Sequence, residues 1–556
     1  MSDETILSQI YHWEESVPDR VHFVQPTGGG HVTEYRWGEI GDQVRRMAAY
    51  LQSLELPPKS QIALLGKNSA HWMMADWAIW MAGHVTVPIY PTLNADSVQY
   101  ILQHSEAKLL FVGKMDDWDA MKAGVPDDLP GVALPLSPGS LPYPRWDDLI
   151  GQHEPVTGKP ERSLDEMATI VYTSGSTGRP KGVMHSFGSF KAAGERFREV
   201  LPTSPEDRML SYLPLAHVYE RVAVENASTY QGFTVYFAES LDTFVQDLQR
   251  ARPTVFLSVP RLWTKFQMGV NEKLPPKKQK ILLMLPVIGN LVRKKILTQL
   301  GLQYCRYAGT GSAPLAASTI NWYRDLGLDL LEGYGMSEDF AVSHLTRPGE
   351  AKVGYVGRPV PGVQARITDS GELLVKSPAQ MMGYFKQPEK TAEEFTEDGF
   401  FKTGDLAQYD DDGRLRITGR VKELFKTAKG KYVAPAPIEN RMASHPSIEV
   451  ICVSGANQSA TFGLVLLSEP TLDALQNGKT DRAALESELS DKMAETNKAL
   501  DPHEQLQFLV IVKDSWSIEN GFLTPTMKIK RNVIEAHYED KVDDWFSRGE
   551  RIIWEA

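Results

Sequence analysis

A loop rich in hydroxyl groups and glycines, residues 172–182, is the segment best suited to bind a charged ligand. It reads Tyr-Thr-Ser-Gly-Ser-Thr-Gly-Arg-Pro-Lys-Gly and follows the apolar run 168–172, which suits a buried strand. Glycine lets backbone N–H groups turn toward one point, the hydroxyls add donors, and Lys181 adds positive charge. The segment therefore predicts a cradle for a polyphosphate, formed by Thr173, Ser174, Gly175, Ser176, Thr177, Gly178 and Lys181.

A flexible Ser/Gly turn is the alternative interpretation of this loop. The spacing lacks the Gly-Lys-Ser/Thr ending of a Walker loop and does not match the dinucleotide fingerprint. The preceding strand, the alternation of hydroxyl and glycine, and the Arg-Pro-Lys-Gly ending favour the cradle. A helical pattern near Ser189 predicts that the loop leads from a strand toward a helix.

The elements that must position this loop alternate between strands and helices through the first two thirds of the chain. The strand-like runs include Gln61–Leu65, Thr234–Phe237 and residues 304–307, with helical patterns between them. Such alternation predicts an α/β fold of mostly parallel, helix-covered sheets, whose ligands bind beyond the carboxyl ends of the strands.

The pattern changes after Gly354, where short strands joined by Asp/Gly turns predict antiparallel hairpins. Short strands and helices follow from Arg420 onward. We therefore predict a large N-terminal domain at 1–419, with a β-barrel-like subdomain near 354–418, and a small α+β C-terminal domain at 420–556.

Composition excludes several classes of protein. The 556 residues are too many for one core, and the net charge of −12 argues against nucleic-acid binding. Cys305 and Cys452 lie in strand-like runs, which predicts buried thiols rather than a disulfide framework or zinc site. The N-terminus lacks a secretory signal, so we expect a cytoplasmic protein. The sequence gives no indication of oligomeric state.

The apolar stretch 281–288 allows two interpretations, because lysines and arginines flank it on both sides. It could lie in a lipid interface, or it could form a core-packed helix pair broken at Pro286 and Gly289. We expect the core-packed pair, and leave open weak peripheral contact at the inner membrane face.

Taken with five other segments, the loop resembles the signature of the adenylate-forming (AMP-binding) superfamily of acyl-CoA synthetases, luciferases and adenylation domains. The other segments follow in the family's order at 311–315, 332–338, 403–405, 419–422 and 525–528, so the resemblance spans nearly the whole chain. It implies that ATP and a carboxylic acid form an acyl-adenylate and pyrophosphate, after which the thiol of coenzyme A attacks the adenylate.

The resemblance also implies roles for individual residues. Glu338, with Thr177, would bind Mg²⁺, Tyr334 would stack on adenine, and Ser337 would donate to the α-phosphate. Asp405 and Arg420 would bind the ribose. The remaining nucleotide contacts would come from Gly311, Ser312, Ala313, Glu332, Gly333, Gly335 and Ile417.

A mobile lysine would supply the catalytic charge in this family. The position matches Lys528, with Lys530 as the alternative, because Thr526 and Met527 stand where relatives have Ser-Gly. The C-terminal domain would be mobile, swinging about Lys422 between adenylation and thioester formation.

Two further segments, 213–220 and 259–263, resemble long-chain fatty acyl-CoA synthetases. His217 would lie near the substrate carboxylate, and His217, Tyr219, Trp263 and Gly309 would line an acyl pocket. A long- or medium-chain fatty acid is the expected substrate. An aryl or branched acid, a carrier-protein acceptor, and a non-catalytic nucleotide- or lipid-binding protein are the alternatives.

Overall fold

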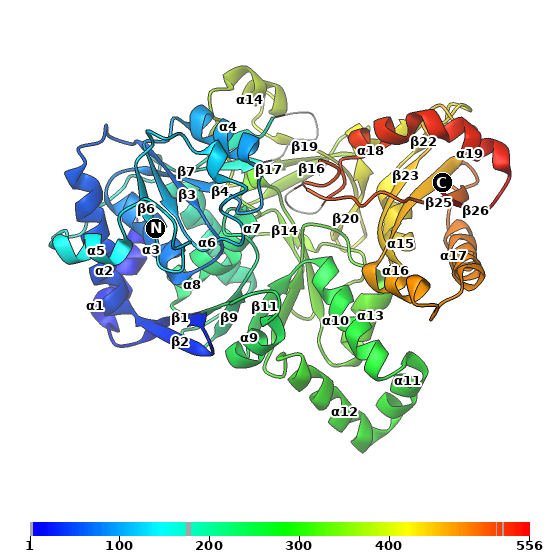
Figure 1. Ribbon diagram of the computed structural model, residues 1–556, viewed down its shortest axis with the longest axis horizontal. Helices are drawn as coiled ribbons and strands as arrows, with labels where there is room; N and C mark the ends of the chain where they lie inside the picture. The colour runs from blue at the N-terminus through cyan, green and yellow to red at the C-terminus, as the bar shows by residue number, and fades with distance from the viewer. Residues whose placement is uncertain (1–3, 174–178, 519, 525–527, 556) are drawn as a thin grey trace.

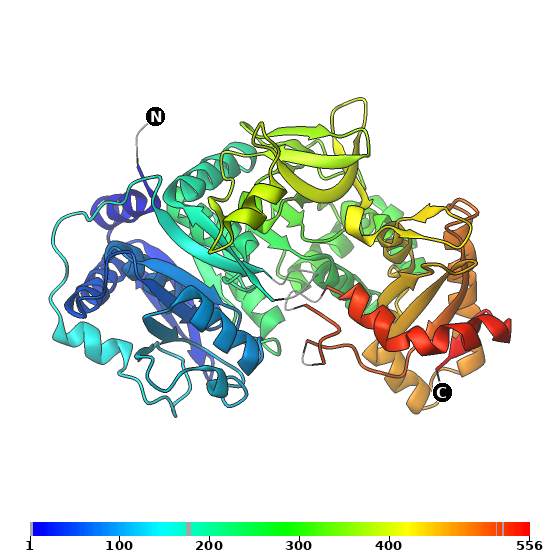
Figure 2. The same cartoon turned by 90° about the horizontal axis from the view of Figure 1, so that it is seen from above.

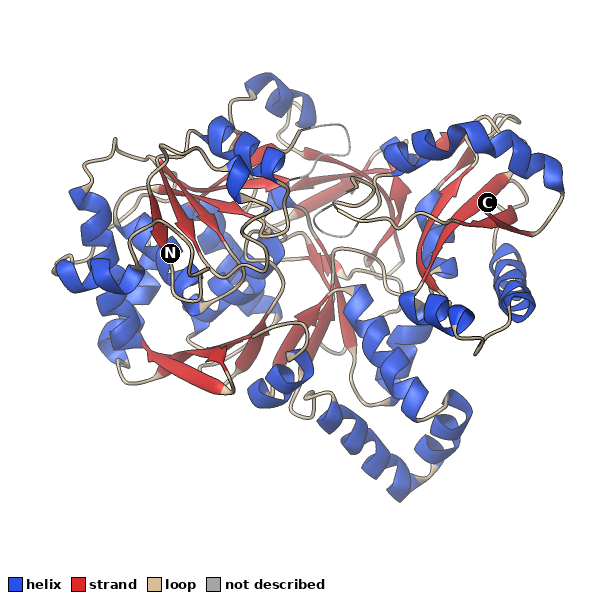
Figure 3. Ribbon diagram, viewed as in Figure 1, coloured by secondary structure: helices blue, strands red, loops and turns tan. Residues whose placement is uncertain are grey.

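The computed structural model describes residues 4–173, 179–518, 520–524 and 528–555. The predicted mixed α/β architecture is confirmed: a large N-terminal body and a smaller C-terminal body lie side by side (Figure 1). Helices surround the sheets of both bodies (Figure 3).

The largest sheet carries the predicted phosphate loop at its edge. Five of its seven strands run parallel, strand β8 pairs antiparallel with β7, and β18 pairs antiparallel with β8. Its order is β18 (Gly383–Tyr384), β8 (Lys181–Ser186), β7 (Met167–Thr173), β4 (Val85–Ile89), β3 (Gln61–Leu65), β5 (Leu109–Val112) and β6 (Gly131–Ala133). Helix α3 (Ala70–Met81) is buried along its whole length, because apolar residues cover all its faces.

Two further sheets of the N-terminal body contain both parallel and antiparallel pairs. One has the order β2 (His31–Arg36), β1 (Val21–Gly28), β10 (Thr234–Phe237) and β9 (Arg208–Ser211). The other has the order β11 (Val255–Ser258), β12 (Tyr307–Thr310), β13 (Leu330–Tyr334), β14 (His344–Leu345) and β15 (Arg358–Pro359). The other principal helices of the N-terminal body are α1 (Ile6–Ser16), α2 (Trp37–Ser53), α4 (Ala95–Ser105), α6 (Phe187–Val200), α9 (Phe244–Ala251), α10 (Pro260–Lys273) and α13 (Ala317–Asp325).

All strand pairs of the sheet between residues 364 and 420 are antiparallel, as the Asp/Gly turns predict. The sheet is β16 (Gln364–Ile367), β17 (Glu372–Lys376), β19 (Phe401–Tyr409) and β20 (Leu415–Arg420). The C-terminal body has its own sheet and apolar cores. Its elements are β21 (Phe425–Lys426), β22 (Tyr432–Val433), α15 (Pro435–Met442), β23 (Ile448–Ser454), β24 (Thr461–Leu467), α16 (Glu469–Gln476), α17 (Arg482–Asn497), β25 (Leu506–Ile511), α18 (Arg531–Tyr538), α19 (Val542–Arg548) and β26 (Ile552–Trp554).

Three local predictions are wrong. The phosphate loop leads into strand β8, which forms a hairpin with β7, and α6 begins only after this strand. Of the predicted strand at 304–307 only Tyr307 is in a strand, as the first residue of β12, and Tyr304 in the preceding turn is 54% exposed. Cys305 therefore lies outside a strand and is only half-buried, whereas Cys452 is buried; both thiols are free.

The predicted helix pair is present and breaks at Pro286, but it continues through Gly289 and is not core-packed. Helices α11 (Pro276–Met284) and α12 (Pro286–Gln299) project from the lower edge of the N-terminal body (Figure 1). Together they bury only Gln279, Gly289 and Ile296. Over the described residues, no helix is long and apolar enough to cross a membrane.

Candidate active site

A cavity of about 1140 Å³ lies where the parallel sheets, the antiparallel sheet and the C-terminal body meet. Viewed from above, the segment before α18 reaches from the C-terminal body toward the N-terminal one (Figure 2). Most of the predicted site residues that the structure describes line this cavity. They are Thr173, Lys181, His217, Tyr219, Gly309, Gly311, Ser312, Gly333, Tyr334, Gly335, Ser337, Glu338, Asp405, Arg420, Lys422 and Lys528.

The two ends of the phosphate loop are held together at the cavity wall. Thr173 ends β7 and Lys181 begins β8, and the two are paired in the hairpin register. The Lys181 ammonium lies 4.7 Å from the ring centroid of Tyr384, a cation–π distance. The predicted residues between these ends, Ser174, Gly175, Ser176, Thr177 and Gly178, lie outside the described residues.

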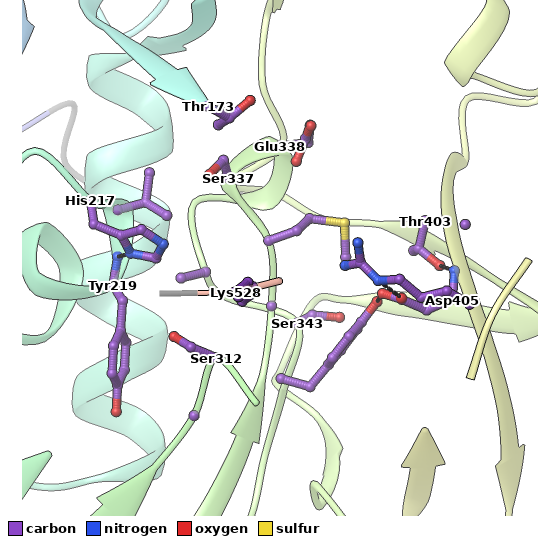
Figure 4. Close-up of a pocket in the computed structure, with 18 of the residues that line it drawn as sticks. Thr173, His217, Tyr219, Ser312, Ser337, Glu338, Ser343, Thr403, Asp405 and Lys528 are labelled. Atoms are coloured by element: carbon purple, nitrogen blue, oxygen red, sulfur yellow. Dashed lines mark hydrogen bonds and ion pairs between the residues drawn. The ribbon is translucent and has the colours of Figure 1, made fainter. Parts of the chain in front are cut away.

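Glu338 faces the cavity beside this hairpin (Figure 4). The hydroxyl of Tyr384 donates a hydrogen bond to Glu338 Oε1 over 2.9 Å. Burial raises the pKa of Glu338, and the bond from Tyr384 opposes that rise. Tyr384 was not predicted, because no motif links it to a carboxylate 46 residues away.

A buried histidine fixes the backbone of Ser337. His185 Nε2 lies 2.7 Å from the carbonyl oxygen of Ser337, which can only accept, so the ring donates. Burial lowers the pKa of His185 to about 3, so its ring is neutral and carries its proton on Nε2. This bond fixes the turn from which the Ser337 hydroxyl reaches the cavity.

Asp405 accepts from two predicted residues at the opposite wall. Tyr334 OH donates to its Oδ2 over 2.6 Å, and Arg420 Nε lies 2.8 Å from its Oδ1. Asp405 and Arg420 face each other in the β19–β20 register, which explains their close pairing. Gly404 adopts a φ of +70°, a left-handed conformation that favours glycine at the bend before Asp405. The Thr403 hydroxyl accepts from Asp405 N over 3.0 Å.

His217 reaches the cavity from the start of a short helix, α7 (Val218–Glu220). Its Nδ1 accepts from Tyr219 N over 3.1 Å. Burial and the nearby charge of Lys528 lower the pKa of His217 to about 4, so the neutral ring carries its proton on Nε2. The ring is thus a donor suited to a carboxylate oxygen.

The segment behind His217 is anchored by a buried carboxyl group. Glu220 Oε1 accepts from Ser211 Oγ over 2.8 Å, Tyr212 N over 3.0 Å and Asn68 Nδ2 over 3.2 Å. Burial raises the pKa of Glu220 to about 8, so the carboxyl group is largely protonated at neutral pH. These contacts hold the helix that presents His217 and Tyr219.

Lys528 extends into the middle of the cavity (Figure 4). The backbone pairs of Thr524 with Lys528 and of Phe522 with Lys530 form a small hairpin that carries it. Water reaches the side chain, but the surrounding protein atoms displace much of its hydration. That loss, together with the charge of Arg420, lowers the pKa of Lys528. Lys530 also lines the cavity.

Four predicted site residues do not line the cavity: Ala313, Glu332, Ile417 and Trp263. Glu332 is turned away, where its Oε2 accepts from Gly354 N over 2.9 Å and burial raises its pKa to about 7. Trp263 is fully buried and donates to Gly309 O over 3.1 Å. The Trp263 ring is surrounded by core residues and not by the cavity. It therefore supports the strand that carries Gly309.

An apolar part of the cavity was not predicted. It is formed chiefly by residues from α4, α6 and the helical segment after α7: Ile101, Phe197, Leu201, Val222, Ala223 and Leu257. These residues come from distant segments and carry no shared spacing, so only the tertiary structure reveals them. Their side chains give the cavity apolar wall segments that suit a hydrocarbon group.

Comparison with known proteins gives concordant results. The family described as AMP-binding enzyme matches residues 10–385, and the one described as AMP-binding enzyme C-terminal domain matches residues 423–550. The long-chain-fatty-acid–CoA ligase FadD15 of Mycobacterium bovis is 32% identical, over 98% of this chain and 97% of its own. Human long-chain-fatty-acid–CoA ligase 1 is 30% identical, over 88% of this chain and 79% of its own.

Among solved structures, the adenylation domain of a carboxylate reductase from Mycobacterium chelonae has the same fold. The TM-score is 0.81 at 22% sequence identity, covering 98% of this chain and 92% of that one.

Proposed function

The chain belongs to the family of AMP-binding enzymes, and we propose that it joins a long- or medium-chain fatty acid to coenzyme A. The reaction has two steps. The acid carboxylate attacks the α-phosphorus of ATP, forming acyl-adenylate and releasing pyrophosphate, and the thiol of coenzyme A then displaces AMP from the adenylate.

The observation that carries this proposal is the position of Lys528. Its cation shares one cavity with the phosphate-loop ends, the Tyr334–Asp405–Arg420 group and His217. Adenylation brings two anions together, so it needs positive charge and hydrogen-bond donors between them. Lys528 and the Nε2–H of His217 are suited to the acid carboxylate, and Ser337 to the α-phosphate.

The nucleotide would bind between the hairpin and the antiparallel sheet. Tyr334 supplies a ring for adenine, and Asp405 still has lone pairs for the ribose hydroxyls. The phosphate loop and Lys181 would hold the terminal phosphates.

Glu338 suits a bound Mg²⁺. Among the described residues, no group of three or more His, Cys, Asp or Glu side chains gathers to hold a metal ion. A single carboxylate fits Mg²⁺, which retains waters and takes further ligands from substrate phosphates. When bound, the ion would neutralise phosphate charge, with Thr177 as the second protein contact.

The C-terminal body would serve both steps. Lys422 lies in the short turn Val421–Glu423, between the last strand of the antiparallel sheet and the C-terminal body. Rotation there would withdraw Lys528 after adenylation and open a path for coenzyme A.

The apolar side chains in the cavity wall favour a fatty acid, because they suit a hydrocarbon chain. An aryl or branched acid is the second candidate, since the same wall would accept it. A carrier-protein thiol is the alternative acceptor.

A pyrophosphate-release screen over acid chain length, with and without coenzyme A, tests the function. We expect release that depends on acids of medium to long chain, and acyl-CoA formation when coenzyme A is present. No release with any acid, despite ATP binding, would contradict an enzymatic role. Release that never yields acyl-CoA would leave the carrier-protein acceptor.

A further inference from the structure

The α11–α12 hairpin exposes a continuous set of large apolar side chains. Six of the sixteen large apolar residues that are exposed in the described chain fall within residues 281–291. The exposed fractions are 64% for Ile281, 74% for Met284, 41% for Leu285, 73% for Val287, 45% for Ile288 and 64% for Leu291. We call these six residues the apolar tip. Such clustering marks an interaction surface, because single exposed apolar residues are normally scattered.

The charge around the apolar tip is opposite to that of the whole protein. Residues 276–299 contain six lysines and arginines and no acidic residue, although the chain has a net charge of −12. Five of the six are exposed lysines at 277, 278, 280, 294 and 295. A partner must therefore be apolar in its interior and negatively charged at its surface.

The inner side of the hairpin is firmly attached to the body, so the exposed tip is not an unfolded segment. The buried amide of Gln279 donates to Asn271 Oδ1 over 2.7 Å and accepts from Trp322 Nε1 over 2.8 Å. Arg293 Nε donates to Asp325 O over 2.7 Å. Leu283, Val292 and Leu297 pack against the apolar core around Phe256 and Trp263.

We propose that the α11–α12 hairpin docks on an anionic lipid bilayer, with the apolar tip in the acyl boundary and the lysines at the headgroups. Amphipathic helices with basic flanks bind bilayers in this way without spanning them. Lysines and arginines near an anionic membrane surface strengthen such binding by electrostatic attraction. A second copy of this chain suits the surface less well, because a symmetric contact would bring two basic clusters together. The inference goes beyond the proposed function and does not depend on it.

Flotation of the full chain with vesicles tests the proposal. Vesicles of phosphatidylcholine containing about one third phosphatidylserine should capture the protein at least tenfold better than phosphatidylcholine alone at low salt, and added salt should weaken capture. Equal recovery with both vesicles, or with neither, would overturn the anionic bilayer as partner.

Paired variants separate the tip from general surface effects. Met284→Glu/Val287→Glu should reduce capture at least tenfold, whereas Leu241→Glu, at an 87% exposed apolar residue elsewhere, should not. Lys277→Glu/Lys278→Glu should also reduce capture at least tenfold. The control is Lys479→Glu/Lys513→Glu, at two exposed lysines elsewhere, which should not reduce it. All variants should keep the wild-type circular dichroism spectrum and melting temperature, which report folding.

Two results would overturn the proposal at this stage. One is capture of the Met284→Glu/Val287→Glu variant at the wild-type level. The other is a wild-type dimer in solution that the same variant converts to monomer, which would assign the tip to a second copy.

Discussion

The hydroxyl of Tyr334 donates a 2.6 Å hydrogen bond to Oδ2 of Asp405, joining the end of a parallel strand to an antiparallel strand 71 residues later. Arg420 occupies the other oxygen of the same carboxylate. The Tyr334 ring is proposed to stack on adenine, and the Asp405 carboxylate is proposed to bind ribose. The hydrogen bond holds these two groups in a fixed position relative to each other.

Replacing Tyr334 by Phe should weaken ATP binding while keeping the ring. Losing one charge-assisted hydrogen bond of about 1–2 kcal/mol should raise the KM for ATP about five- to thirtyfold. The matched control is Tyr409→Phe, because Tyr409 lies on the same strand as Asp405, bonds to His344 and does not itself line the cavity. Equal ATP dependence of the two variants would refute the role of the Tyr334–Asp405 bond.

Replacing Tyr384 by Phe should weaken the response to Mg²⁺. The variant loses the donor to Glu338 Oε1 but keeps the ring beside Lys181, so the pKa of Glu338 should rise further. We expect the Mg²⁺ concentration for half-maximal pyrophosphate release to rise three- to tenfold, about 1 kcal/mol. Tyr432→Phe, at an exposed tyrosine, is the control. An unchanged Mg²⁺ titration would argue against Glu338 as the metal ligand.

Replacing Glu332 by Gln should change stability and leave ATP binding intact. Burial raises the folded-state pKa of Glu332 from 4.5 to about 7, so its contribution to stability is present below pH 4.5 and is lost as pH rises toward 7. Gln cannot ionise. The variant should therefore gain up to ~3 kcal/mol over wild type between pH 5 and pH 8, measured by denaturant unfolding.

The control for that measurement is Glu389→Gln, at an exposed position in the helix Pro388–Glu394. The sequence-based prediction placed Glu332 at the nucleotide. A tenfold rise in the KM for ATP in Glu332→Gln would restore that prediction and contradict the orientation toward Gly354.

Replacing Lys422 by Pro should slow thioester formation more than adenylation, because a fixed φ restricts rotation at the proposed hinge. Lys422→Ala removes the charge but keeps backbone freedom, so it should preserve both rates. Single-turnover measurement of each half-reaction gives the comparison. Equal slowing of both steps by proline would remove the hinge assignment.

An element could be predicted from the sequence when a short contiguous run of residues determines it, and was missed when contacts between distant segments determine it. Strands β3 and β10 were predicted with their exact bounds, because each is a short run of strand-forming residues that ends at a turn. Strand β8 was missed. Gly182 and His185 weaken its pattern, and its pairing with β7 stabilises it.

The same distinction explains which site residues were predicted and which were missed. Those inside contiguous motifs, such as Asp405 and Arg420, were predicted and line the cavity. Tyr384 was missed because tertiary contacts bring it to Glu338: the β18–β8 pairing and the bond from Met381 N to Glu338 O. Trp263 shows the converse error, since a tryptophan beside a motif can belong to the core.

The rate of pyrophosphate release by Lys528→Ala tests the central claim most directly, with Lys530→Ala as the matched variant from the same hairpin. Loss of the ammonium between carboxylate and α-phosphate should slow adenylation at least a hundredfold, about 3 kcal/mol, while the Kd for ATP changes less than threefold. Lys530→Ala should stay within about threefold of wild type. Release by Lys528→Ala at the wild-type rate would contradict the account, and a large loss in Lys530→Ala alone would transfer the role to that residue.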